Sequence, residues 1–270
     1  MLAPPRFSIP GVVRQARRVF QYGDLLGTLS RHRLSVRYKQ SLLGGAWALL
    51  QPLAMMLVFT AVFSKLVHVP SDGVPYALFA YAGILPWTFC SGAVSSATNS
   101  LVSHAQLVTK VYFPREILPI SYLIASLSDF LIGAITLVAL CILYGIRVSP
   151  ELLMTIPIVI LLGSFALSCG LILSSVQVRF RDVGIALPIA LQLLMFGSPV
   201  LYPLRVVPQS WRSLYLLNPL AGLIDGFRRA VLGLPLDLPA LATATVVTCA
   251  LLPIAYLVFK RAEVTVADVI

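Results

Sequence analysis

Long uncharged stretches dominate the hydrophobic pattern of this 270-residue chain. A helix needs about 20 apolar residues to cross the roughly 30 Å hydrocarbon layer of a bilayer. Five stretches without Asp, Glu, Lys or Arg reach that length: residues 40–64, 73–109, 152–178, 183–204 and 238–259. A sixth, residues 117–146, reaches it with Asp129 as its one interior charge. Because backbone polar groups in lipid must be satisfied within the segment, the pattern predicts an all-α membrane protein with six transmembrane helices per subunit.

Turn signals and polar islands divide the chain, a single transmembrane domain over residues 1–270, into predicted elements. The predicted spans cover residues 45–66, 76–103, 117–144, 151–176, 183–202 and 238–259. Residues 104–116 form a polar island between spans two and three. Residues 203–236, between spans five and six, are rich in leucine and aromatic residues but are broken by Pro and Gly. Short re-entrant helices in the outer leaflet fit that composition, because irregular backbone at membrane depth must be covered by protein.

The first 44 residues are basic and precede the first span. Leu25, Leu29, His32 and Val36 recur at i, i+4, i+7 and i+11, with arginines on the flanks of this stripe. The spacing predicts an amphipathic helix on the membrane surface. The alternative is a basic anchor that serves topology only. Because no apolar region precedes a small-residue cleavage site, we expect no cleavable signal peptide and the first span to stay as an anchor.

Charge is scarce, and its distribution predicts the orientation. The chain is 59% hydrophobic and 11% charged, with a net charge of +10. Six spans put both termini on one side, and that side holds 14 Arg and Lys residues against six on the other. The positive-inside rule therefore places both termini in the cytoplasm. We expect membrane lipids as the surroundings and no nucleic-acid partner.

The chain lacks the residues of an ATPase. A phosphate-binding loop needs a lysine followed by Ser or Thr. The only lysines, Lys39, Lys65, Lys110 and Lys260, are followed by Gln, Leu, Val and Arg. The four cysteines have no paired spacing and the three histidines are scattered, so neither a disulfide nor a metal site is expected. We therefore expect no catalytic, cofactor or metal site, and energy supplied from elsewhere.

Asp129 is the one clear ionisable residue within a predicted span. Ser126 and Ser128 beside it are candidate hydrogen-bonding neighbours. Two interpretations remain open for this carboxylate: a helix-packing residue or one near a wet cavity, and a proton relay. The second would make the chain a proton-coupled lipid or drug carrier that works alone.

Four blocks of sequence carry a resemblance to a known family. They are VRYKQSLLGGAWALLQPL (36–53), KVYFPREILPIS (110–121), RFRDV (179–183) and SPVLYP followed by LNPLAGLIDGFR (198–228). In this order, over nearly the whole chain, they resemble the transmembrane permease subunits of type-2 ABC transporters that export polysaccharides. The O-antigen (lipopolysaccharide) exporter permeases resemble it most, with capsule and teichoic-acid exporters as near relatives. A drug-exporting permease of the same class is the alternative.

The resemblance implies partners, cargo and location. It implies a homodimer with two separate cytoplasmic ATPase subunits, which bind ATP and Mg²⁺, in the bacterial inner membrane. The cargo would be a polyprenyl-pyrophosphate-linked glycan. It also implies that residues 104–116 form a coupling helix that docks into the ATPase, although an ordinary polar loop is the alternative. The apolar contacts would be Leu107, Val111, Tyr112 and Phe113, and the polar contacts Lys110, Arg115 and Glu116.

The same resemblance suggests residues along a transport path. Arginine binds phosphate through its planar fork, so the basic residues before span one are candidates for a pyrophosphate entrance, namely Arg31, Arg33, Arg37 and Lys39. Their alternative role is topology and contact with lipid headgroups. Aromatic faces suit a sliding glycan, and the channel candidates are Trp47, Tyr81, Trp87, Phe89, Phe196 and Tyr202. The alternative for each is packing or the membrane-interface belt. Trp211 and Tyr215 are candidates for an outer gate.

Overall fold

The computed structural model describes residues 21–39, 43–146 and 149–269, and this part of the chain is helical without a β-strand. The prediction of an all-α membrane protein is confirmed. Residues 1–20 of the predicted interface helix lie outside the described residues. The apolar helices of the bundle are α3 (Trp47–Phe59), continued by the π-helical η2 (Thr60–Leu66), α4 (Tyr76–Thr98), α7 (Ile117–Leu143), α8 (Thr155–Arg179), α9 (Val183–Phe196) and α12 (Leu238–Val269).

Five helical stretches within the described residues are long and apolar enough to cross a membrane. The fifth predicted span, 183–202, is different, because its helix α9 has only 14 residues. At 1.5 Å per residue this is about 21 Å, short of the roughly 30 Å hydrocarbon layer. The helix ends where Gly197 is followed by Ser198 and Pro199. Proline removes a backbone donor and disfavours helical geometry in the residue before it, so the helix stops there.

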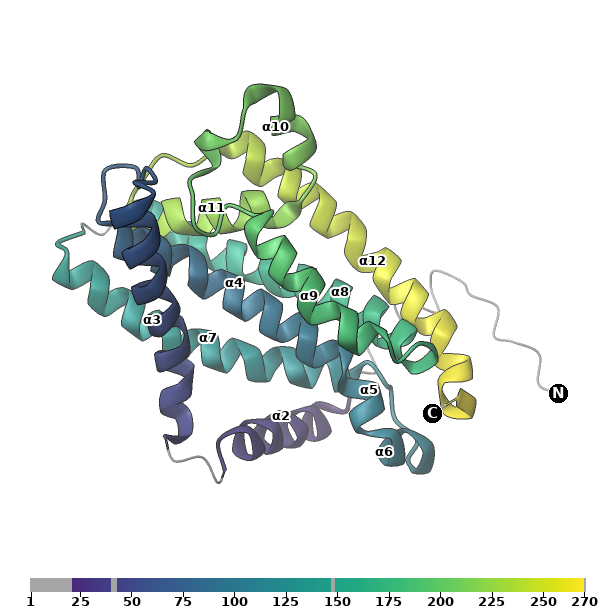
Figure 1. Cartoon of the computed structure of the whole chain (residues 1–270). Helices are drawn as coiled ribbons and strands as arrows, with labels where there is room; N and C mark the ends of the chain where they lie inside the picture. The colour runs from purple at the N-terminus through teal and green to yellow at the C-terminus, as the bar shows by residue number, and fades with distance from the viewer. Residues whose placement is uncertain (1–20, 40–42, 147–148, 270) are drawn as a thin grey trace.

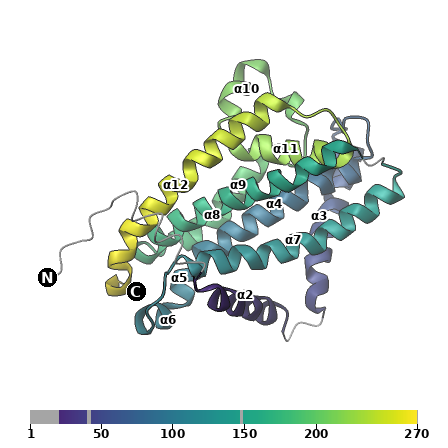
Figure 2. The same cartoon turned by 180° about the vertical axis from the view of Figure 1, so that it is seen from behind.

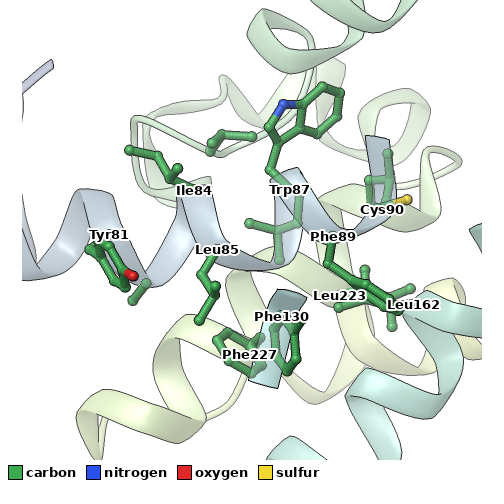
Figure 3. Packing of buried hydrophobic residues seen from close by; sticks show 14 of the residues in the cluster. Tyr81, Ile84, Leu85, Trp87, Phe89, Cys90, Phe130, Leu162, Leu223 and Phe227 are labelled. Atoms are coloured by element: carbon green, nitrogen blue, oxygen red, sulfur yellow. The ribbon is translucent and has the colours of Figure 1, made fainter. Parts of the chain in front are cut away.

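Helix α4 lies at the centre of the subunit, as Figures 1 and 2 show from opposite sides. Helices α3, α7, α8, α9 and α11 (Pro219–Leu232) all contact it, and α12 packs along α8. Figure 3 shows side chains of α4 meeting those of its neighbours. The rings of Phe89 and Phe130 are 5.3 Å apart, and those of Phe130 and Phe227 are 5.8 Å apart. Contacts between these three aromatic rings therefore join α4, α7 and α11.

Small residues allow α7 and α8 to approach α4 closely. A Cβ atom built on Gly133 of α7 would lie 2.6 Å from Cδ1 of Leu85, and one on Gly170 of α8 would lie 2.5 Å from Cβ of Ala97. Both distances are too short for a real contact. Membrane helices gain packing contacts rather than hydrophobic free energy when they associate, so small residues at these crossings are expected.

Short helices occupy the two ends of the bundle. We call the end that carries α2 (Gly23–Tyr38), α5 (Ser100–Ser103) and α6 (Ala105–Lys110) the inner end, after the predicted topology. The outer end carries α10 (Gln209–Tyr215) and α11, which lie within residues 203–236, where the sequence predicted short helices (Figure 1). On α2, Leu25 and Leu29 pack against a buried cluster that includes Val108.

Candidate functional site

The predicted coupling segment forms a helix shorter than residues 104–116. Helix α6 ends at Lys110, and Val111 has extended backbone (φ −123°, ψ 134°). Pro114 follows soon after and disfavours helical geometry at Phe113. The chain then returns to α7, which begins at Ile117. The segment is therefore one short helix followed by a non-helical turn.

The predicted coupling residues divide into an exposed tip and a buried base. Tyr112 is 90% exposed, and its neighbours Lys110 and Val111 are exposed as well. Phe113 is only 5% exposed and belongs to the buried cluster at the inner end, against which half-buried Leu107 packs. We call Lys110, Val111 and Tyr112 the tip. Of the predicted coupling residues, the three residues of the tip are the exposed ones.

Glu116 is the base of this segment and is buried within an ionic cluster. Its Oε2 atom lies 2.7 Å from Nζ of Lys260, and Tyr256 donates a hydrogen bond of 3.2 Å to its Oε1. Lys260 also lies 2.8 Å from the Oε2 atom of Glu263. Half-buried Arg115 donates from its backbone N–H to Glu263 Oε1 at 3.3 Å, and from its guanidinium to the Glu263 carbonyl. The tip is therefore tied to α12 through its own base.

The basic residues before span one have different environments. Arg31 and Lys39 are exposed, whereas the side chain of Arg37 lies outside the described residues. Arg33 is half-buried: its guanidinium hydrogen-bonds the ring of His104 and lies 4.1 Å from the centre of the Tyr122 ring. Helix α2 is thus attached at Arg33 to the junction between α5 and α6.

The hydrogen bonds of His104 indicate a neutral ring. Its Nδ1 atom lies 2.9 Å from the carbonyl oxygen of Ser100, which can only accept, so Nδ1 carries the hydrogen. The Nε2 atom is then free to accept from Arg33. Burial lowers the pKa of His104 below its usual 6.5, the Ser100 carbonyl opposes this, and the charges of Arg33 and His32 lower the pKa further. The Arg33 contact therefore depends on an uncharged His104.

The predicted channel aromatics divide between the core and the surface. Tyr81, Trp87 and Phe89 are buried on α4 (Figure 3). Tyr81 donates a 3.0 Å hydrogen bond to the carbonyl of Gly133. Trp47 and Phe196 are exposed. Trp47 and Phe89 line one cavity of about 260 Å³ between α3, α4 and α7. The structure therefore brings Trp47 and Phe89 together at this cavity.

Tyr202 and the predicted gate residue Tyr215 contact each other at the outer end. Their hydroxyl oxygens are 3.0 Å apart, and Tyr202 donates to the carbonyl of Phe196 at 2.8 Å. Tyr215 must then be the donor to Tyr202. Trp211, the other gate candidate, is exposed on α10. The two tyrosines therefore join α10 to the end of α9.

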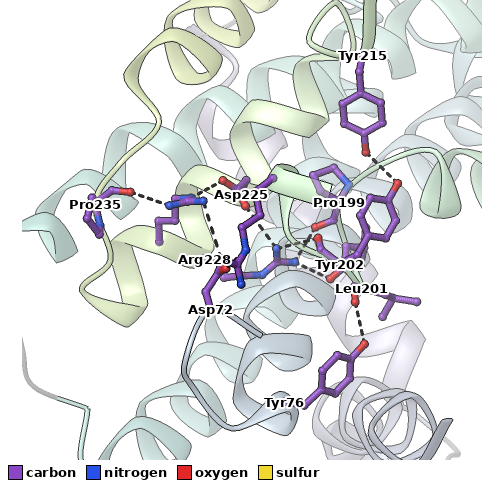
Figure 4. A network of polar contacts seen from close by, with 12 residues as sticks. Asp72, Tyr76, Pro199, Leu201, Tyr202, Tyr215, Asp225, Arg228 and Pro235 are labelled. Atoms are coloured by element: carbon purple, nitrogen blue, oxygen red, sulfur yellow. Dashed lines mark hydrogen bonds and ion pairs between the residues drawn. The ribbon is translucent and has the colours of Figure 1, made fainter. Parts of the chain in front are cut away.

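A buried charge network near these tyrosines was not predicted from the sequence. Arg228 is fully buried and donates hydrogen bonds to the carbonyls of Pro199 at 2.7 Å and Val200 at 2.6 Å (Figure 4). Asp225 lies 3.6 Å from Arg228 and 2.6 Å from Arg229. The i, i+3 and i, i+4 spacing of these charges on one helix was a local signal for the pairing. What the sequence lacked was the position of the carbonyls that Arg228 binds.

Gly83 of α4 makes room for this arginine. A Cβ atom at Gly83 would lie 2.2 Å from Nη2 of Arg228 and 2.3 Å from the carbonyl oxygen of Val200. The guanidinium also lies 4.0 Å from the centre of the Phe79 ring. The network therefore fixes the turn after α9 onto α4 and α11.

Comparison with known proteins identifies the family. Residues 24–232 match the family model described as ABC-2 type transporter. The chain is 32% identical over 219 residues to the O-antigen export system permease protein RfbA of Myxococcus xanthus, covering 80% of this chain and 84% of the relative. A Klebsiella pneumoniae protein of the same name is 29% identical over 76% of the chain and 79% of the relative. The polysialic acid transport protein KpsM of Escherichia coli is 27% identical over 74% of the chain and 78% of the relative.

Proposed function

Because this chain belongs to the ABC-2 type transporter family, we propose that it is the permease subunit of an exporter that moves a lipid-linked polysaccharide of O-antigen type across the inner membrane. Two copies form the conduit, and two cytoplasmic ATPase subunits bind ATP and Mg²⁺ and supply the energy. The cargo is supported by the relatives, whose names specify O-antigen export and polysialic acid transport.

The exposed tip supports docking of an ATPase most directly. Tyr112 is 90% exposed beside exposed Val111, although both side chains are apolar enough to favour burial. Exposed apolar groups rimmed by polar residues are typical of interaction sites. The base of the tip is held by Glu116 and Lys260, so a displacement of the tip would be passed to α7 and α12. A partner that binds here can therefore move the bundle.

Exposed apolar faces on two helices support pairing with a second copy. Helix α3 belongs to the least buried of the five spanning stretches, and it exposes Leu57 and Val58. Helix α9 exposes Ile185, Ile189 and Leu193. A helix too short to span alone, such as α9, gains from a neighbour that covers it. We propose that α3 and α9 form the interface between the copies.

The substrate path follows the predicted residues. Arg31 and Lys39 are exposed at the inner end, where a pyrophosphate would arrive. Arg37 belongs to the same predicted set, whereas Arg33 is engaged with His104 and Tyr122. Trp47 and Phe196 are the exposed members of the channel set. We propose Arg31 and Lys39 as the first contacts of the headgroup.

One experiment tests the export function and the docking site together. Cells that lack the chain should accumulate lipid-linked glycan at the cytoplasmic face, and the wild-type chain should restore export and co-purify with an ATPase. Val111→Ala with Tyr112→Ala should lose that ATPase, because both apolar contacts of the tip are removed. Tyr144→Ala is the matched control, since Tyr144 is exposed at the far end of α7.

Two results would contradict the proposal. Normal surface polysaccharide in cells without the chain would exclude polysaccharide as its cargo. Unchanged ATPase recovery with the double tip variant would remove the tip as the docking site.

A further inference from the structure

The cavity between α3, α4 and α7 combines aromatic and polar side chains at membrane depth. It holds about 260 Å³ and is lined in part by Trp47, Gln51, Thr88, Phe89, Ser126 and Asp129. Asp129 is the thirteenth residue of the 27-residue α7, so the cavity reaches the middle of that span. A carboxylate, hydroxyls and an amide line it together with three aromatic rings, those of Trp47, Phe89 and Phe130. Sites of this mixed composition bind small polar ligands.

Ser126 contributes to this lining a hydroxyl that has no hydrogen-bond partner among the described residues. The side chain is 5% exposed, and its buried Oγ atom has no hydrogen-bond partner. Other serines of α7 differ: Ser121 donates to the carbonyl of Leu118 at 2.8 Å, and Ser128 donates to that of Ile124 at 3.1 Å. A buried hydroxyl without a partner costs free energy, which a bound ligand would recover.

The lining favours a sugar over the other small groups found in a membrane. An acyl chain would leave the buried Ser126 hydroxyl without a hydrogen-bond partner, at a cost in free energy. A metal ion would require more ligands, and no group of three His, Cys, Asp or Glu side chains occurs among the described residues. A sugar ring offers hydroxyl donors to a carboxylate, acceptors to a serine, and an apolar face to an aromatic ring.

We propose that this cavity is a subsite for one sugar residue of the exported glycan. Asp129 accepts hydrogen bonds from ring hydroxyls, Ser126 turns about its single side-chain torsion to pair with another, and Trp47 covers the apolar face of the ring. The volume lies below the roughly 300–1,000 Å³ of pockets for drug-sized ligands, which limits the occupant to about one ring. This subsite rests on the proposed export of a polysaccharide.

Gly92 provides a direct way to close the subsite. It lines the cavity, and a Cβ atom built on it meets nothing within 4 Å. Gly92→Leu therefore adds an apolar side chain to the cavity lining at a position where its Cβ atom meets no other atom. Asp129→Asn removes the negative charge and one acceptor oxygen, and Ser126→Ala removes the hydroxyl, each at nearly constant volume. Ser128→Ala is the matched control, because its hydroxyl bonds a backbone carbonyl and does not line the cavity.

Fluorescence of Trp47 reports binding. The full chain is reconstituted in lipid nanodiscs with Trp87→Phe and Trp211→Phe, so that Trp47 is its one tryptophan. The probe is lipid-free glycan released by mild acid from the cell's own lipid-linked glycan. We expect a saturable change in fluorescence, from which an affinity for the glycan follows. That affinity should fall about tenfold or more in Gly92→Leu and Asp129→Asn, less in Ser126→Ala, and not at all in Ser128→Ala.

Several outcomes would overturn the subsite. They are the absence of a saturable change, an unchanged affinity in Gly92→Leu, or an equal response to inorganic pyrophosphate, which would assign binding to the headgroup. If Asp129→Asn does not fold, Gly92→Leu and Ser126→Ala decide the result. Normal glycan export by Gly92→Leu in cells that require the chain would refute the subsite alone, whereas export without the chain would refute the proposed function.

Discussion

The inner and outer ends of the bundle both hold buried charges, but they use them differently. At the inner end, Glu116 and Lys260 join segments 144 residues apart. At the outer end, Asp225, Arg228 and Arg229 lie on one helix, α11. Arg228 donates hydrogen bonds to the backbone carbonyls of Pro199 and Val200, in the turn after α9. The Glu116–Lys260 pair connects α7 to α12, whereas the Arg228 network holds the turn after α9 in place.

The difference explains what each end can do. The inner pair leaves Tyr112 exposed four residues away, so it supports a surface that a partner can bind. The outer network closes a gap: Arg228 occupies the space that Gly83 leaves open and is covered on all sides. A buried charge costs much free energy unless it is paired and hydrogen-bonded. Substitution of a buried charge should therefore lower the free energy of unfolding more at the outer end than at the inner end.

Replacing Arg228 should have the largest effect on stability. Arg228→Met leaves two buried carbonyls without a donor and Asp225 with one partner fewer, so the free energy of unfolding should fall by about 3–5 kcal/mol. Arg205→Met is the control. Its side chain is 57% exposed and pairs with Asp72 at 2.6 Å, and its loss should cost under about 1 kcal/mol. Denaturant titration in mixed micelles measures both, and equal losses would contradict a special role for burial.

Replacing Glu116 should have an intermediate effect. Glu116→Gln keeps the shape of the side chain but removes its charge, while Lys260 retains Glu263 as a partner. The free energy of unfolding should fall by about 1.5–3 kcal/mol. Tyr112→Ala, four residues earlier, should change it by less than about 0.5 kcal/mol, because the side chain is exposed. The same titration checks this pair of variants.

A larger loss of stability in Tyr112→Ala than in Glu116→Gln would show that the tip, rather than its base, is part of the fold. Recovery of the ATPase separates the two roles further. We expect Tyr112→Ala to reduce it more than Glu116→Gln does.

Protonation of His104 should release α2 with little loss of stability. Its pKa is lowered mainly by burial, so the ring is neutral above its usual value of 6.5 and remains so somewhat below it. The hydrogen bond from Arg33 to His104 is present at pH values above the lowered pKa. It is lost as the pH falls through that pKa, because both ring nitrogens then become donors. Spin labels at Arg31→Cys and Gln106→Cys, in a chain without its native cysteines, should report a broader distance distribution near pH 5 than at pH 8.

Two variants separate His104 from other titrating groups. His104→Gln should abolish the pH response, since an amide does not titrate. His32→Asn should keep it, because His32 acts only through its charge. A pH response that survives in His104→Gln would assign it to another group.

Much of the fold could be predicted from the sequence because lipid imposes a simple rule. Uncharged stretches of about 20 residues must be helical, and five of the six predicted spans have helices of that length within the described residues. The Pro- and Gly-broken stretch after α9 likewise folds as the short helices α10 and α11. Pro199 is a local signal for the end of α9 at Gly197. The uncharged run around it nevertheless predicted a span that continues to residue 202.

The sequence by itself therefore determined five of the six predicted spanning helices and the family blocks, since hydropathy and local turn chemistry act over a few residues. Only the tertiary structure decided which polar groups meet. Glu116 finds Lys260, Arg33 finds His104, and Ser126 and Asp129 line a cavity with Trp47, across separations that no local pattern encodes. These pairings depend on how α4 is surrounded, because close helix packing selects the side chains that come within hydrogen-bonding distance.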